Sequence, residues 1–197
     1  MNAAPLIDLD AELQAGSQAP VFDAFGADGP RLPQMPQSGL KPEWAKLTGK
    51  IRRASRLMDE GKEAEAARVA LKIVEAAPDF GLANQVMAMA LERLGRLSTA
   101  LEFYERAYKV DPNNVDLYRN LALVAWKMGM LEAAEKFLRI FTQMDPDNWS
   151  GLSNLACVLR DQGRYEDAIE IVRAEIYRRP DVPELWNTMA TVMLEQG

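Results

Sequence analysis

Residues 115–148 read VDLYRNLALVAWKMGMLEAAEKFLRIFTQMDPDN, and this stretch decides the fold. A first series of apolar residues recurs at helical spacing and stops at Gly129, because glycine readily adopts the positive φ that ends a helix. A second series ends at Phe141, and Pro146 follows it in a turn sequence that a helix cannot continue through. The stretch therefore predicts two helices joined by a short turn. The two apolar series are Leu117, Leu121, Val124 and Ala125, then Ala134, Phe137, Leu138 and Phe141.

The same pattern returns every 34 residues along the chain. Five of the 12 glycines fall in register, which is improbable at ordinary composition, so the repeat is real. The columns that share the interval are Gly61, Gly95, Gly129, Gly163 and Gly197; Pro78, Pro112, Pro146 and Pro180; Ala66, Ala100, Ala134 and Ala168; and Ala54, Ala88, Ala122, Ala156 and Ala190. One helix pair cannot bury its own apolar face, so neighbouring pairs must stack. We therefore predict an all-α fold, a right-handed α-solenoid.

These columns resemble the tetratricopeptide repeat (TPR), whose marks are a small Ala in the first helix, Gly at the turn, Ala early in the second helix and Pro at the exit. Trp186 and Tyr118 occupy the column of the family's tryptophan, and Tyr165 follows the turn at Gly163. The resemblance implies a right-handed superhelix of helix-turn-helix units over residues 41–197. The units are 47–80, 81–114, 115–148, 149–182 and a lone first helix, 183–197.

Two units depart from the family pattern. Lys50 and Arg53 stand where apolar residues are usual, and Ile73 stands where Ala is usual, so we expect the first unit to act as a polar cap. Glu175 replaces a late Ala of the second helix in unit 149–182. The pattern alone offers no reason for this glutamate.

Residues 1–40 differ from the array because five prolines and four glycines interrupt them. Five acidic residues oppose the single Arg31. Such a segment sustains neither helix nor strand for long. We therefore predict a flexible, mostly irregular acidic arm at residues 1–40.

Composition excludes several functions. The chain contains no histidine, which removes the commonest general base and metal ligand, and the single Cys157 forms no internal disulfide or cysteine-rich metal site. The net charge of −6 argues against broad nucleic-acid binding. No apolar stretch is long enough for a signal peptide or membrane insertion. We expect a cytoplasmic, non-catalytic protein without cofactors or metals.

In this family the first helix of each pair lines a concave surface, and partner contacts come from positions 2, 5, 9, 12 and 13 of the unit. The resemblance therefore implies a protein or peptide ligand. Chaperone-binding members hold a C-terminal carboxylate with Lys at position 5 and Asn at position 9, and these columns lack that pair. We predict instead a helix or extended peptide whose acidic groups meet arginines at a mixed apolar stripe. The candidate partner-binding residues are Gln85, Met89, Arg93, Arg119, Leu123, Trp126, Lys127, Ser153, Cys157, Arg160 and Asn187.

Structural roles compete with this interpretation. Trp126 is also suited to bracing adjacent repeats, and Cys157 to simple packing. The arginines are equally suited to a solvated face, paired with Asp116, Asp161 or Glu92.

Three functions remain open. The chain is a free-standing interaction scaffold or adaptor, or a substrate-recruiting module of a larger enzyme such as a protein glycosyltransferase, or a self-assembling repeat protein. The third alternative arises because helix 183–195 ends the array without a following helix, which favours homo-oligomers through this open end. We expect it to leave an uncovered strip made of Leu185, Trp186, Met189, Val192 and Met193.

Overall fold

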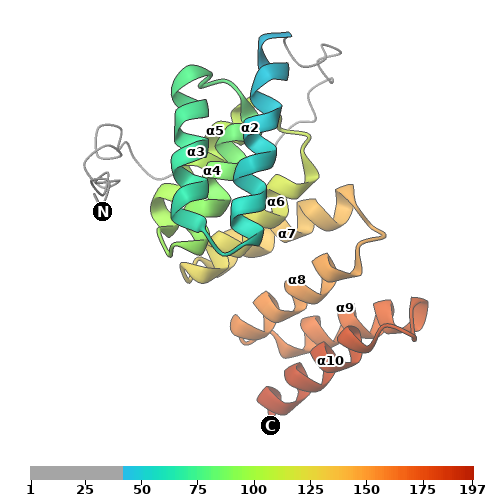
Figure 1. The fold of residues 1–197 in the computed structure, drawn as a ribbon. Helices are drawn as coiled ribbons and strands as arrows, with labels where there is room; N and C mark the ends of the chain where they lie inside the picture. Colours follow the sequence, from blue (N-terminus) through green and yellow to red (C-terminus); the bar gives the residue numbers. More distant parts are fainter. Residues whose placement is uncertain (1–41) are drawn as a thin grey trace. The chain divides into compact units, whose positions relative to one another are not determined.

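The computed structural model describes residues 42–197, with side chains from residue 47 onward, so the predicted arm lies outside the described residues. This part of the chain contains helices and turns and no strand, which confirms the all-α prediction (Figure 1). The helices are α2 (Pro42–Asp59), α3 (Glu63–Ala76), α4 (Gly81–Arg93), α5 (Leu97–Val110), α6 (Val115–Lys127), α7 (Leu131–Met144), α8 (Trp149–Asp161), α9 (Tyr165–Arg178) and α10 (Pro183–Gln196).

Each helix packs against the helix before it and the helix after it (Figure 1). The first helices of successive pairs also touch: α4 contacts α2 and α6, and α10 contacts α8. A one-dimensional stack of helix pairs is the arrangement of an α-solenoid. The predicted fold class is therefore confirmed.

The turn inside each helix pair explains the glycine column. Gly129 has a φ of 75°. Its N–H donates to the carbonyl of Trp126, while the N–H of Met130 reaches back to Ala125, each at 2.9 Å. This is the Schellman arrangement, which satisfies carbonyls at the helix end and requires the left-handed conformation that glycine adopts without strain. The same two bonds recur at the other three internal turns, at Gly61, Gly95 and Gly163.

The proline column has a second role at the start of the first helices. At Pro78, Pro112 and Pro180 the carbonyl accepts a hydrogen bond from the side chain six residues later, at position 4 of the next unit; Pro146 does not, because Leu152 has no donor. An amide, a phenol and an indole all make this contact, so the contact requires a side chain with a hydrogen-bond donor and not one particular residue type. The pairs are Asn84 to Pro78 (2.7 Å), Tyr118 to Pro112 (2.9 Å) and Trp186 to Pro180 (2.9 Å).

The core between successive pairs is built from large and small residues that complement each other. Gly151 in α8 lies against Phe141 of α7, and a Cβ added at Gly151 would fall 2.5 Å from the ring. At the corresponding positions one unit earlier the sizes are reversed, with Ala107 and Leu117. Interiors at crystal-like density accept this exchange because total volume is conserved.

The structure accounts for the two departures from the family pattern. Lys50 and Arg53 are exposed on α2, as expected of a polar cap. Glu175 is only 2% exposed, and its carboxylate pairs with Arg178 at 3.1 Å and Arg179 at 2.9 Å. Arg179 also reaches the carbonyl of Asp147. The buried glutamate therefore has charged partners that link the end of α9 to the α7–α8 turn.

One expectation about the last helix is wrong in part. Leu185 and Val192 are fully buried, because α10 packs against both α8 and α9. Trp186 and Met193 remain 52% and 56% exposed, and Met189 is half-buried. The uncovered strip is therefore narrower than its sequence pattern indicates.

Candidate protein-binding surface

The eleven candidate residues all lie on the first helices α4, α6, α8 and α10, on what we call the first-helix surface: positions 2, 5, 9, 12 and 13 of each unit. Their exposure varies. Arg93, Lys127 and Asn187 are exposed, whereas Gln85 is buried at 9%. The half-buried remainder comprises Met89, Arg119, Leu123, Trp126, Ser153, Cys157 and Arg160.

A row of contacts joins successive first helices at their C-terminal ends. In each, position 12 of one unit meets position 13 of the next, thirty-five residues later. The chemistry changes from one junction to the next while the geometry is kept. We call these contacts the inter-repeat braces: Glu92 with Lys127 (2.6 Å), Trp126 with Asp161 (2.6 Å) and Arg160 with Glu195 (3.2 Å).

The braces use several predicted partner-binding residues. Trp126 is a hydrogen-bond donor to the next repeat, and Arg93 donates to the carbonyl of Met58 at 2.7 Å. Arg160 lies between two carboxylates, those of Asp161 and Glu195. The bracing interpretation is therefore confirmed for Trp126.

The first brace continues into the second helix of its own unit. Glu92 accepts a hydrogen bond from the hydroxyl of Tyr104 at 3.0 Å as well as from Lys127. Burial raises the pKa of Tyr104 strongly, and the negative charge of Glu92 raises it further. The phenol therefore keeps its proton and serves as a fixed donor that orients the glutamate.

Cys157 has no chemical activation. Burial raises the pKa of its thiol, the charge of Arg160 opposes that rise, and the charges of Asp161 and Glu195 add to it. A thiol whose pKa is raised is a poor nucleophile at neutral pH. The packing interpretation of Cys157 fits these surroundings.

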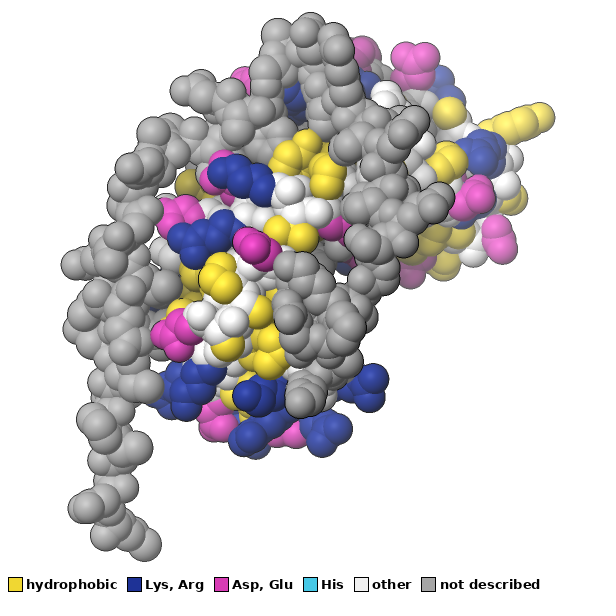
Figure 2. Space-filling view, turned by 90° about the horizontal axis from the view of Figure 1, so that it is seen from above, with side chains coloured by type: hydrophobic (Ala, Val, Ile, Leu, Met, Phe, Trp, Pro, Cys, Tyr) yellow, Lys and Arg dark blue, Asp and Glu magenta, His cyan; other side chains and the backbone are white. Residues whose placement is uncertain are grey.

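Arg119 and the apolar residues at position 9 lie outside the braces. The guanidinium of Arg119 pairs with Asp116 at 3.3 Å, but its Nε is buried and has no hydrogen-bond partner among the described residues. Met89 and Leu123 occupy position 9 in α4 and α6 and are half-buried. Figure 2 shows basic, acidic and hydrophobic side chains interspersed on the visible face of the described residues, with several Lys and Arg side chains gathered along its lower edge.

A cavity that the sequence did not indicate opens beside this surface. It has a volume of about 200 Å³ and lies where the start of α4 meets the end of α5 and the start of α6. Sequence reasoning missed it because Val110 and Asp111 lie outside the first-helix columns. The available signal was Gly81, which stands where other units have Val115 or Trp149.

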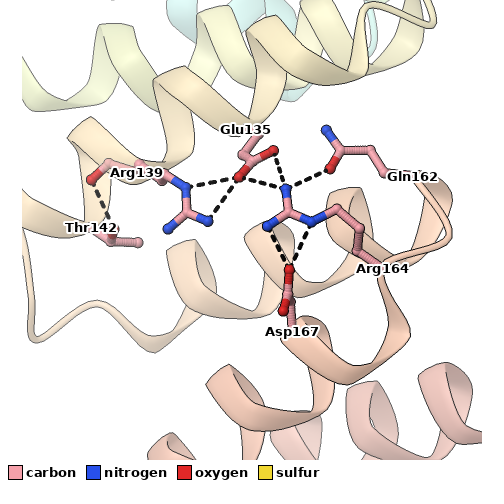
Figure 3. A network of polar contacts seen from close by, with 6 residues as sticks. All are labelled: Glu135, Arg139, Thr142, Gln162, Arg164 and Asp167. Atoms are coloured by element: carbon pink, nitrogen blue, oxygen red, sulfur yellow. Dashed lines mark hydrogen bonds and ion pairs between the residues drawn. The ribbon is translucent and has the colours of Figure 1, made fainter.

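A polar network away from this surface connects α7 to the α8–α9 turn (Figure 3). The carboxylate of Glu135 accepts hydrogen bonds from Arg139 at 2.9 Å and from Arg164 at 2.9 and 3.0 Å. Arg164 also pairs with Asp167 at 2.6 Å. Burial raises the pKa of Glu135, but hydrogen bonds from Arg139, Gln162 and Arg164 outweigh that effect and lower it overall. The network braces consecutive repeats on another face.

The described part of the chain holds no group of three or more acidic or cysteine side chains arranged to bind a metal ion. Within residues 42–197, no helix combines the length and hydrophobicity that crossing a bilayer requires. The geometry offers hydrogen-bond donors, apolar contact area and a cavity. These features suit a binding surface.

Comparison with known proteins agrees with this geometry. A family model described as TPR repeat matches residues 90–129, and one described as tetratricopeptide repeat matches residues 119–183. No curated protein sequence matches the chain significantly. Among similar solved structures, MamA is 16% identical over 71% of this chain and 81% of that chain, with a TM-score of 0.64. YrrB, described as a TPR protein with an unusual peptide-binding site, is 16% identical over 73% of this chain and 74% of that chain, with a TM-score of 0.63. TTC0263, a thermophilic TPR protein of Thermus thermophilus, is 21% identical over 74% of this chain and 80% of that chain, with a TM-score of 0.64. The repeat columns, the stacked helix pairs and the two family models together show that this chain belongs to the tetratricopeptide-repeat family.

Proposed function

We propose that the chain is a non-catalytic interaction scaffold that binds a peptide or helix of a partner protein on its first-helix surface. The TPR fold supports protein–protein recognition in general. A TPR protein with a similar fold, YrrB, is described as having a peptide-binding site. Within this chain, the support comes from a few side chains of α4 and α6.

The observation that carries the proposal is the guanidinium of Arg119, whose ion pair with Asp116 at 3.3 Å leaves further N–H donors. Its Nε–H is shielded from solvent, so a ligand oxygen meets the exposed part of the guanidinium. Because Arg119 is positively charged and 38% of its side chain is exposed, a carboxylate is the favoured acceptor. Met89 and Leu123 supply apolar contact area on the same two helices, and methionine adapts to varied partner shapes.

The other basic candidates are less available to bind an acidic group of the ligand, because contacts within the chain already engage them. Lys127 is held by Glu92, and Arg160 by two carboxylates. Arg93 is engaged with a backbone carbonyl. We therefore assign the acidic group of the ligand to Arg119.

The experiment measures binding of a fluorescent pool of 12-residue peptides, each with a central Glu between two apolar residues, by fluorescence polarisation. Arg119→Ala with Leu123→Ala is expected to weaken binding at least about tenfold, because a few side chains, arginines often among them, carry most binding energy, and the loss of Leu123 also removes apolar contact area. The matched control is Arg173→Ala with Ile169→Ala on α9, a second helix. Equal binding by the Arg119/Leu123 variant and the wild type contradicts the proposal.

Self-association through α10 is a second candidate. Trp186 is tied to Pro180 yet 52% exposed, whereas Tyr118 in the same column is 2% exposed. An exposed indole beside Met193 favours association. Analytical ultracentrifugation over a wide concentration range tests this, with Trp186→Ser as the comparison. A single monomeric species at all concentrations excludes it.

A further inference from the structure

We infer that the cavity at the start of α4 is a side-chain subsite that takes an aliphatic residue of a bound peptide and favours a Lys or Arg next to it. The inference rests on the proposed function, because it adds a second point of recognition to the same surface. Leu82 and Gln85, at positions 2 and 5 of their unit, form one wall of the cavity.

The cavity is more apolar than polar and is open to solvent. Its volume is about 200 Å³, and Phe80, Val110 and Leu117 form much of its lining. Leu82 and Val110 at its rim are 44% and 37% exposed, which is unusual for large aliphatic residues in this chain. An aliphatic side chain that enters the cavity removes these surfaces from water together with its own.

Gly81 lines the cavity and lies close to Val110, another of its lining residues. A Cβ at position 81 would lie 3.3 Å from Val110, so a larger residue here would crowd this part of the lining. The other units carry Leu47, Val115, Trp149 and Pro183 at this position, so Gly81 is the one glycine in this column.

Polar groups beside the cavity indicate how a peptide is held. The side-chain oxygen of Gln85 accepts a long hydrogen bond, 3.4 Å, from the amide of Asn114. These two amides have further donors and acceptors for a peptide backbone. The carboxylate of Asp111 lines the same cavity, is exposed and accepts the N–H of Asn113 at 3.2 Å.

No lysine or arginine of the described residues forms an ion pair with Asp111. A Lys or Arg that follows the aliphatic residue along the peptide supplies the positive charge that pairs with Asp111. The pair favours selectivity more than affinity, since exposed ion pairs are weak. The stated ligand is therefore a Leu-Arg type of sequence, which differs from the acidic sequence assigned to Arg119.

The test uses the full chain labelled with nitrogen-15 and three pools of acetylated hexapeptide amides. One pool has a fixed central Leu-Arg, one Leu-Glu and one Ser-Arg. We expect saturable amide shifts at Gly81, Val110 and Asp111 with the Leu-Arg pool and weaker binding of the other two. Shifts confined to other residues, or equal affinity for all three pools, overturn the inference.

Variants separate the cavity from the rest of the surface. Gly81→Val places a side chain against Val110 in the lining of the cavity and is expected to reduce Leu-Arg affinity at least about tenfold, while Gly49→Val, with open space around it, leaves it unchanged. Should Gly81→Val lower the melting temperature, Leu82→Ser gives the same test at an exposed position. Asp111→Asn is expected to bring the Leu-Arg and Leu-Glu pools within about twofold of each other.

The two proposals fail in different ways. Arg119→Ala is expected to leave Leu-Arg binding intact, and Gly81→Val to leave binding of the acidic 12-residue pool intact. Unchanged binding of the acidic 12-residue pool by the Arg119/Leu123 variant overturns the Arg119 assignment and leaves the cavity assignment standing. Wild-type binding of Leu-Arg by both Gly81→Val and Leu82→Ser overturns the cavity assignment and leaves the proposed function standing.

Discussion

The indole Nε1 of Trp126 donates a hydrogen bond to Oδ2 of Asp161, 2.6 Å away in the next repeat. Lys127 makes the equivalent contact to the preceding repeat, through Glu92. A tryptophan that serves as a brace has a different role from one that anchors a partner, although the residue type is common in both. A substitution of Trp126 is therefore expected to change the stability of the repeat array, whether or not Trp126 also contacts a partner.

The first prediction concerns this pair. Trp126→Phe and Asp161→Asn should each destabilise the chain, and the double variant should lose less than the sum of the two. We expect a coupling free energy of about 1 kcal/mol, typical of a hydrogen bond to a charged group near the surface. Urea denaturation followed by circular dichroism measures it. Strict additivity would show that the two side chains do not interact in solution.

The second prediction concerns packing of α8 on α7. Gly151→Ala places a Cβ 2.5 Å from the ring of Phe141, which is 1% exposed. The ring has little room to move, so overpacking should cost about 1–3 kcal/mol. Thermal unfolding measures this loss.

The matched control for Gly151 is Gly49, because both glycines lie within helices. A Cβ at Gly49 meets nothing within 4 Å. Gly49→Ala should therefore stabilise α2 by about 0.5–1 kcal/mol through reduced backbone entropy of the unfolded chain. Stabilisation by Gly151→Ala to the same extent contradicts the packing argument.

The third prediction concerns pH. The folded-state pKa of Glu135 lies below the unfolded value of 4.5, since Arg139 and Arg164 hold its charged form. Its contribution to stability is therefore complete at pH values above 4.5 and is lost as pH falls through the lower folded value. Glu135→Gln should destabilise the chain at pH 7 by about 1–3 kcal/mol, and by progressively less in acid.

Denaturation midpoints between pH 7 and pH 3 measure the Glu135 effect. Glu132→Gln, at an exposed position of the same helix, is the control and should change the wild-type profile little. A constant difference between Glu135→Gln and wild type across this pH range would contradict the assignment.

The fourth prediction concerns the contact between position 4 and the proline carbonyl. Tyr118→Phe removes the hydroxyl that donates to the carbonyl of Pro112 at 2.9 Å and leaves that carbonyl without this partner. We expect a loss of about 1 kcal/mol. Tyr165→Phe is the control, because no hydrogen bond of the Tyr165 hydroxyl occurs among the described residues. Equal losses of stability in Tyr118→Phe and Tyr165→Phe would show that the hydrogen bond to the Pro112 carbonyl does not stabilise the fold.

The candidate site was only partly predictable. Sequence columns located Arg119, Leu123 and Met89 on first helices, because the 34-residue period fixes which residues share a position. They did not indicate that Arg119 keeps an unsatisfied donor while Lys127 is held by Glu92. That distinction depends on which side chains of neighbouring repeats come within hydrogen-bonding distance.

The sequence by itself determined the helix pairs, their turns and their stacking. Turn glycines need a positive φ, exit prolines end helices, and helical periodicity marks the buried face, all of which are local properties of the chain. Only the tertiary structure decided which side chains pair across repeats, that Phe141 requires Gly151, and that a cavity is lined by Gly81 and Val110. These features depend on volumes and distances between residues ten or more positions apart, which local periodicity does not encode.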